Sequence, residues 1–136
     1  MLKRCNIETL LISNTENGED LIRTAAKGGC LIEENGLMLR YPEKENKGTA
    51  SLLLTDGLAD LKRNGDTRSR MTFVEGKLLP CAYTTPRGTI DFSLFTHQQH
   101  FTVNGEGGKF EARYTMLAAG KQVADNVLTV EWTFCD

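Results

Sequence analysis

The 136-residue chain lacks the charge imbalance and the long apolar runs that mark several large classes of protein. It carries 16 Lys and Arg against 18 Asp and Glu, a formal net charge of -2. Such a balance provides no concentrated positive potential for phosphate or anionic lipid, which argues against nucleic-acid and membrane-surface partners. No stretch reaches the roughly 18 apolar residues that a membrane-spanning helix needs.

An export signal and paired cysteine motifs are also missing. Near the start, the only uninterrupted apolar run is Leu10-Leu11-Ile12, which is too short for the core of a signal peptide. The four cysteines are too far apart for a Cys-x-x-Cys motif, and they are Cys5, Cys30, Cys81 and Cys135. These observations predict a cytoplasmic protein with four reduced thiols on strands. Two disulfides in an exported protein are the alternative.

The residue combinations of common enzymes are scarce as well. His97 and His100 are the only histidines and have no third ligand nearby in sequence, so we expect them to be polar surface residues. No Gly-x-Ser-x-Gly nucleophile motif occurs. The glycine-rich segment 105–109 has the wrong spacing for a phosphate loop and is followed by Phe110 instead of Ser or Thr. We therefore expect no catalytic residue, no metal and no cofactor.

What the chain does contain is a regular series of turn signals with alternating apolar residues between them. Leu128, Val130, Trp132 and Phe134 alternate with polar residues, as they would along a half-buried strand. No long amphipathic helix is visible, and residues 16–24 are the least implausible place for a short one. The length suffices for one hydrophobic core, so we expect a single domain over residues 1–136.

Three turns predict the register of neighbouring strands. A two-residue turn at Asn35-Gly36 pairs Ile32 with Leu39 and Cys30 with Tyr41, which places apolar side chains opposite one another.

The other two turns are interpreted as three-residue loops. The loop at Asn64-Gly65-Asp66 pairs Ala59 with Met71, and the loop at Glu75-Gly76-Lys77 pairs Met71 with Cys81. Three consecutive strands then share one buried face.

About ten short antiparallel strands joined by hairpins form either a closed up-and-down barrel or a two-sheet sandwich. The barrel is favoured because closure removes exposed strand edges. A barrel of about eight strands can hold one small ligand or be filled by its own side chains. The expected fold class is therefore all-β, an antiparallel barrel of about 8–10 strands.

Several segments in order resemble the YwiB-like family of small Gram-positive bacterial proteins, a domain of unknown function with a calycin (lipocalin-like) β-barrel. They are Leu61-Lys62-Arg63-Asn64-Gly65, Met71-Thr72-Phe73 with Gly76, Tyr83-Thr84-Thr85-Pro86-Arg87-Gly88, Thr96, Gly108 before Phe110 and Tyr114, and Asn126-Val127-Leu128. The resemblance runs from about residue 20 to the end and implies a calycin-like barrel in the cytoplasm, with no activity to carry over. Tyr41-Pro42-Glu43 departs from the Tyr-Glu-Glu associated with that strand end.

Arg63 is the most informative candidate residue. The predicted register places it on the inner face at a strand end, where its guanidinium must find a partner or water. It can bind a carboxylate or phosphate at the barrel mouth, or cap the barrel by bonding backbone carbonyls. Tyr41, Tyr83 and Tyr114 are further inner-face candidates, as cavity-lining residues or as core tyrosines with satisfied hydroxyls.

These features favour non-catalytic binding of a small apolar or amphipathic molecule inside the barrel, with Arg63 and the three tyrosines as contacts. The alternative is a structural or regulatory module with a filled barrel, whose outer face meets another protein or a second copy. An enzyme of unfamiliar type is a third and weaker hypothesis. Neither nucleic acid nor membrane is an expected partner.

Overall fold

The computed structural model describes residues 1–135, and ten strands account for most of them. The strands are β1 (Leu2–Thr15), β2 (Gly18–Glu33), β3 (Gly36–Glu43), β4 (Gly48–Thr55), β5 (Leu58–Asn64), β6 (Arg68–Phe73), β7 (Leu78–Thr85), β8 (Gly88–Val103), β9 (Gly107–Ala118) and β10 (Lys121–Phe134). Each strand is antiparallel to the next, and β1 pairs with β10, so the sheet closes into a barrel. The expected antiparallel all-β barrel is confirmed.

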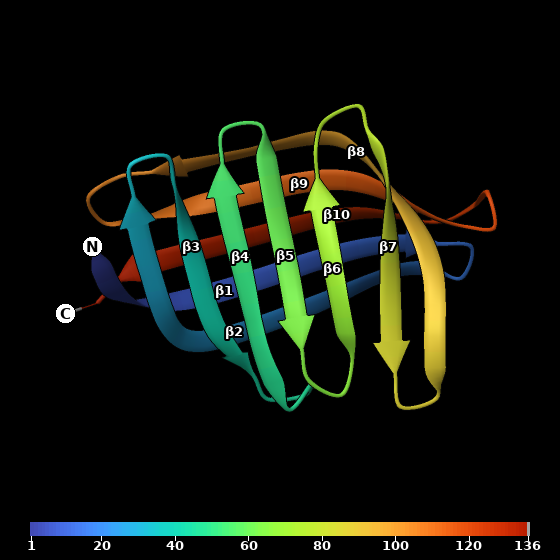
Figure 1. Ribbon diagram of the computed structural model, residues 1–136, viewed down its shortest axis with the longest axis horizontal. Helices are drawn as coiled ribbons and strands as arrows, with labels where there is room; N and C mark the ends of the chain where they lie inside the picture. Colours follow the sequence, from blue (N-terminus) through green and yellow to red (C-terminus); the bar gives the residue numbers. More distant parts are fainter. Residues whose placement is uncertain (136) are drawn as a thin grey trace.

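The barrel is flattened into two crossing layers (Figure 1). The shorter strands β3 to β7 form one layer, and β1, β9 and β10 run across behind them. β2 and β8 belong to both layers because each bends midway. β2 pairs with β3 only from Gly29 onward, and β8 has a bulge between Thr96 and Gln98, so a glycine pair and a bulge make the two corners.

The expectation of short strands throughout, and of a possible helix over residues 16–24, is wrong. β1 and β2 form one hairpin of 14 and 16 residues, in which Thr15 lies opposite Gly18 and Asn14 opposite Glu19. Gly18 follows the turn with a φ of 111°, a conformation that glycine adopts without strain. Pairing with β1 therefore determines the structure of residues 18–24.

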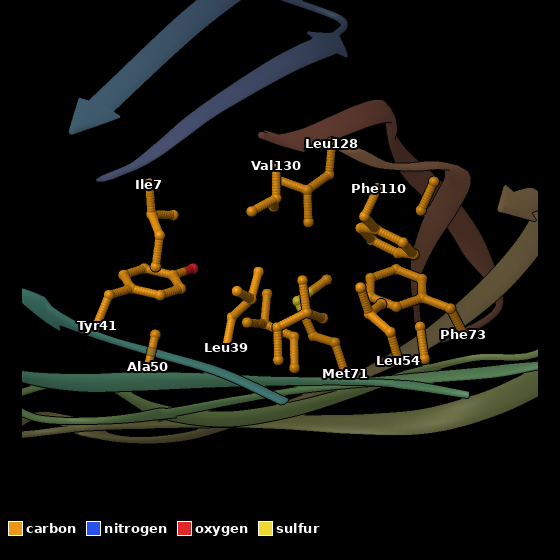
Figure 2. Packing of buried hydrophobic residues seen from close by; sticks show 14 of the residues in the cluster. Ile7, Leu39, Tyr41, Ala50, Leu54, Met71, Phe73, Phe110, Leu128 and Val130 are labelled. Carbon is orange, nitrogen blue, oxygen red and sulfur yellow. The ribbon is translucent and has the colours of Figure 1, made fainter. Parts of the chain in front are cut away.

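The core occupies the space between the two layers. Figure 2 shows Leu128 and Val130 of the long strands pointing toward Leu39 and Met71 of the short ones. The largest fully buried apolar side chains are Trp132, Phe73, Phe110, Ile7, Leu39, Leu52, Leu54, Leu94 and Val130. Each such side chain contributes about 1.5–3 kcal/mol by leaving water. The centre of the barrel is therefore filled.

The predicted register at Asn35-Gly36 is wrong by two residues, although the buried face is right. Cys30 lies opposite Leu39, and Glu33 lies opposite Gly36, so the turn residues are Glu34 and Asn35. Gly36 is needed for space: a Cβ there would lie 2.2 Å from the Leu54 carbonyl oxygen. The glycine thus serves the contact between β3 and β4 and not the turn.

The loop between β5 and β6 has the predicted three residues but begins one residue later. Ala59 lies opposite Phe73, and Met71 lies opposite Leu61, so the predicted pairing of Ala59 with Met71 is wrong. The loop residues are 65–67, because Asn46 of the neighbouring loop bonds to this segment. The shift is again two residues in register, which leaves the same side chains inside.

β6 and β7 pair in the predicted register, but only over two residue pairs. Ser69 lies opposite Tyr83, and beyond this point no pairing of the two strands is present within residues 1–135, so Met71 and Cys81 are not paired. The connection instead bonds to β8: the Gly76 N–H donates to the Thr96 carbonyl oxygen over 2.8 Å.

The four cysteines are free in the structure. Cys135 follows the end of β10, so the expectation that all four lie on strands is wrong for that residue. Among residues 1–135, no helix is long and apolar enough to cross a membrane.

Candidate functional site

The barrel opens beside β2. This strand pairs with β1 along its whole length but with β3 only over Gly29–Glu33. Gly28 lies at the point of separation, where a Cβ would come within 2.3 Å of the Arg40 carbonyl oxygen. A glycine is therefore required where β2 bends away from β3, and residues 18–28 of β2 form one border of an opening.

A cleft of about 870 Å³ lies at this opening. Its walls come from β1 and β2 on one side and from the end of β3 with the loop to β4 on the other, and Arg63 reaches it from β5. Figure 2 shows the Ile7 side chain lying over the Tyr41 ring, and both residues line the cleft. The cleft thus has an apolar floor that continues into the filled core.

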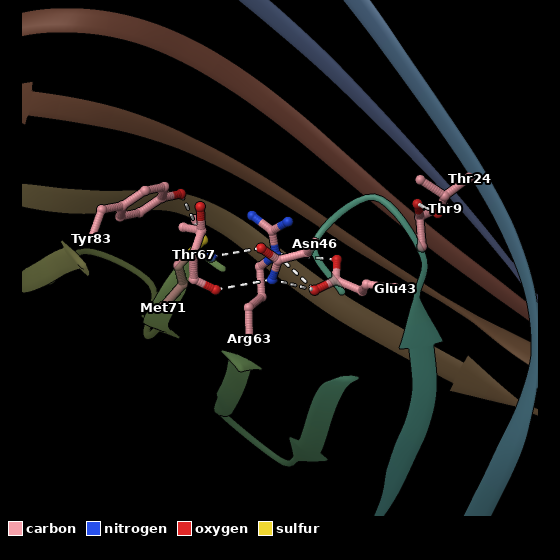
Figure 3. A network of polar contacts seen from close by, with 8 residues as sticks. All are labelled: Thr9, Thr24, Glu43, Asn46, Arg63, Thr67, Met71 and Tyr83. Carbon is pink, nitrogen blue, oxygen red and sulfur yellow. Dashed lines mark hydrogen bonds and ion pairs between the residues drawn. The ribbon is translucent and has the colours of Figure 1, made fainter. Parts of the chain in front are cut away.

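Arg63 is the cation that reaches the cleft from β5, and the other charged residues that line the cleft are Glu8, Arg23, Lys27, Glu43, Lys44 and Glu45. Its Nε donates to both carboxylate oxygens of Glu43, each over 3.1 Å. Figure 3 shows the two terminal nitrogens pointing away from Glu43, toward the layer of long strands. Within residues 1–135, these two nitrogens have no hydrogen-bond partner. The expected inner-face position is present, but Arg63 bonds a carboxylate and not the backbone carbonyls of the capping alternative.

Asn46 holds Glu43 and Arg63 in place. Its Nδ2 donates to Glu43 over 3.3 Å and to the Thr67 carbonyl oxygen over 2.9 Å, while its Oδ1 accepts the Thr67 N–H over 2.7 Å (Figure 3). Gly65 passes so close that a Cβ would lie 2.1 Å from the Asn46 carbonyl oxygen. The β3–β4 and β5–β6 loops are therefore joined into one rim that carries the ion pair.

The three candidate tyrosines do not all line the cleft. Tyr41 lines it directly, with its ring buried beside Ile7. Tyr83 is half-buried, and its hydroxyl lies 3.6 Å from the Met71 sulfur. Tyr114 is buried deeper, with its ring edge against Phe73. The structure thus brings Arg63 and Tyr41 to one opening and places the other two tyrosines farther inside.

Two rows of polar side chains cross the interior behind Arg63. In one row, Arg63 lies opposite Ser69 and Ser69 opposite Tyr83.

In the second row, Thr96 lies opposite Tyr114 and Tyr114 opposite Asn126. The buried hydroxyls of Ser69 and Thr96 have no hydrogen-bond partner within residues 1–135. Ser69 was missed by sequence reasoning because an isolated serine in a strand gives no signal. Thr96 and Asn126 entered it only as parts of the family resemblance.

Burial raises the pKa of all three tyrosine hydroxyls. For Tyr41 the pKa rises to about 12, because burial disfavours the phenolate and the nearby Glu43 charge adds to this, while Arg63 opposes it. Burial also raises the pKa of Tyr83 and of Tyr114, and in both cases the Arg63 charge acts in the opposite direction. In all three cases burial is the main cause, and the Arg63 charge only opposes it.

These pKa shifts predict a protein that loses stability in alkali. Burial also raises the pKa of Cys81, from 9.0 to about 11. Because the folded state holds these protons more tightly than the unfolded state, we expect full stability below about pH 9 and a decline as the pH rises toward 12. Thermal melts followed by circular dichroism across this range measure the decline, and absorbance at 295 nm reports the phenolates. A native protein that ionises tyrosine near pH 10 without unfolding would contradict the shifts.

Both histidines lie on the exposed outer surface, as expected. His97 occupies the bulge of β8, and its Nε2 lies 2.7 Å from the Thr115 hydroxyl, which donates to Asp125 over 2.6 Å. No group of three metal-ligating side chains is present among the described residues. This polar chain is outside the barrel and separate from the cleft.

Comparison with known proteins gives a family and a fold. The family model described as "Domain of unknown function (DUF1934)" matches residues 6–130. The search of curated proteins found no match. The crystal structure of ywiB protein from Bacillus subtilis is similar with a TM-score of 0.88 at 15% identity, covering 99% of this chain and 94% of that chain. At this identity the likeness shows the fold, and it agrees with the resemblance found in the sequence. Because the family model matches most of its length, the chain belongs to the DUF1934 family, a domain of unknown function.

Proposed function

We propose that the protein binds a small amphipathic anion at the barrel mouth, without catalysis. The acidic group of the ligand contacts the terminal nitrogens of Arg63, and its apolar part lies on the floor formed by Ile7 and Tyr41. The observation that carries this proposal is a half-buried guanidinium, 31% exposed, with terminal nitrogens that have no partner in the described chain and that adjoin an 870 Å³ cleft.

The ion pair with Glu43 holds the Arg63 guanidinium in position but does not occupy all of its N–H donors. Only Nε is bonded to Glu43, so the fork of terminal N–H groups is free for a second, planar anion. Holding Arg63 through Nε also reduces the rotamer freedom that the side chain would lose on binding a ligand.

The filled centre of the barrel limits where a ligand can lie. Fully buried side chains occupy the space between the layers, so the ligand is held at the mouth and not in the middle. The packing in the middle of the barrel also fits the alternative function, a structural or regulatory module with a filled barrel. What distinguishes the two functions is the cleft beside β2, which a purely structural barrel does not need.

A non-catalytic role fits the composition of the cleft. Its lining has no His, Cys or Ser among the described residues, so a Ser-His or Cys-His pair of nucleophile and base is absent there. The free cysteines are consistent with a reducing setting, and we place this activity in the cytoplasm.

A matched pair of fluorescent probes tests the proposal. Dansylaminoundecanoic acid combines an apolar chain with a carboxylate, and its primary amide has nearly the same size and shape but no charge. We expect the acid to bind about 10- to 150-fold more tightly than the amide, because a hydrogen bond to a charged group is worth about 1.5–3 kcal/mol. Fluorescence titration gives both dissociation constants. Equal affinity for acid and amide, or binding of neither, would contradict the proposal.

A further inference from the structure

The cleft is bordered by a strand edge with available backbone groups. The Met1 amine donates to the Ile32 carbonyl oxygen and the Ile32 N–H donates to the Met1 carbonyl oxygen, each over 2.8 Å. Hydrogen-bonded pairs alternate along an antiparallel ladder. The backbone N–H and C=O groups of even-numbered β2 residues therefore bond to β1, and those of odd-numbered residues point away from β1.

The odd-numbered residues of β2 divide into two groups. From Gly29 onward they face β3. Arg23, Ala25 and Lys27 face the cleft side, where no strand pairs with β2 among the described residues. Three backbone N–H groups and three carbonyl groups of β2 therefore point toward the cleft from its border.

The side chains at this border leave room for another chain. Thr24, Ala25 and Ala26 are small, and all three line the cleft. The Thr24 hydroxyl is bonded to Thr9, which holds it against the barrel wall (Figure 3). Arg63 reaches the same cleft from the opposite layer, with its terminal nitrogens directed toward the long strands.

We propose that the anion bound at this cleft is the carboxylate end of an extended peptide, whose backbone pairs with β2 at Arg23, Ala25 and Lys27 and whose C-terminal carboxylate contacts Arg63. This inference rests on the proposed function and names its ligand class. An unpaired strand edge recognises any peptide backbone by adding a strand, and the two unbonded terminal nitrogens of Arg63 select a chain end. Together they favour a peptide over a fatty acid, which uses Arg63 but leaves the edge unpaired.

Affinity-selection mass spectrometry with two peptide pools tests this inference. Mixed-sequence peptides of about six to eight residues span the exposed edge at about 3.4 Å per residue. One pool has a free C-terminal carboxylate and the other a C-terminal amide. We expect the protein to retain peptides from the free-acid pool at least about tenfold more than from the amide pool.

Substitutions at Ala25 examine the strand edge separately from Arg63. Ala25→Pro removes the N–H that faces the cleft while the bonds to β1 stay, and Ala25→Val is the control that keeps the N–H. We expect Ala25→Pro to retain about 3- to 10-fold less peptide than Ala25→Val, while the two variants bind dansylaminoundecanoic acid equally, because that ligand has no backbone to pair with the strand edge. Should Ala25→Pro fail to fold, as checked by thermal melting, Arg23→Pro is compared with Arg23→Val, which lacks the same guanidinium but keeps the backbone N–H.

The outcomes separate this inference from the proposed function. Equal retention of the two pools, or equal retention by Ala25→Pro and Ala25→Val, overturns the peptide inference while binding of the dansyl acid upholds the proposed function. Failure of the dansyl acid to bind contradicts the proposed function itself. A dimer in solution that Ala25→Pro dissociates would assign the β2 edge to a second copy and also overturn the peptide inference.

Discussion

Replacing Phe73 with alanine is expected to lower the free energy of unfolding by about 3–5 kcal/mol, the usual cost of removing a buried aromatic ring. Phe73 is fully buried, and its ring contacts Phe110 at 6.0 Å and Tyr114 at 5.0 Å between centroids. These contacts join the short-strand layer to the long-strand layer. Urea unfolding followed by circular dichroism measures the change.

Phe95→Ala is the matched control for this prediction. Phe95 is a half-buried residue on the outer surface of β8, where its ring contacts His97. We expect a loss well below that of Phe73→Ala, since the outer position leaves no enclosed cavity. Similar losses for the two variants would show that the space between the layers is not the main source of stability.

Replacing Arg63 with alanine is expected to weaken binding of dansylaminoundecanoic acid by about 1.5–3 kcal/mol and to leave binding of its amide nearly unchanged. The reason is that only the acid has a charged group for the terminal nitrogens. The substitution also leaves the Glu43 side chain, which is 18% exposed, without its cation. Some loss of stability will therefore accompany the loss of affinity.

Two further variants control for charge and for position. Lys62→Gln removes a positive charge from the neighbouring residue, which is exposed, and we expect no change in affinity for the acid. Arg63→Lys keeps the charge but loses the planar fork, and we expect an affinity between those of the native protein and Arg63→Ala. An equal decrease in Lys62→Gln and Arg63→Ala would indicate a nonspecific effect of net charge.

The buried face of most strands was predictable because it depends only on the alternation of apolar and polar residues along the strand. Leu128, Val130 and Trp132 are buried as the pattern indicated, while Thr129 and Glu131 are not. The bends in β2 and β8 were not predictable in this way, since a strand that changes layer keeps its alternation. The Gly28-Gly29 pair was a usable signal for the first bend, whereas the bulge at His97 has no comparable sequence mark.

Register was harder to predict than face. At the β2–β3 and β5–β6 hairpins the predicted pairing is displaced by two residues, a shift that keeps the same side chains inside. Hydrophobic pattern cannot distinguish such alternatives. The decisive contacts are long-range: Gly36 against the Leu54 carbonyl and Asn46 against Thr67.

The candidate site was predictable only in part. Arg63 was identified because a cation on an inner face needs a partner, but its partner, Glu43, lies 20 residues away. From the sequence we noted only that Pro42 interrupts the Tyr-Glu-Glu pattern at this strand end, and we did not pair Glu43 with Arg63. The structure places Pro42 in the β3 ladder opposite Thr49 and leaves Glu43 free to hold Arg63.

Binding of an anion by Arg63 is tested most directly by native mass spectrometry of the protein, purified without denaturation from the cells that produce it. We expect a noncovalent adduct of defined mass, removed by acid, that fragments to an anion and is absent from Arg63→Gln isolated in the same way. Lys62→Gln should retain the adduct. A native protein that carries only its own mass, or an adduct equally present in Arg63→Gln, would contradict binding of an anion by Arg63 at the barrel mouth.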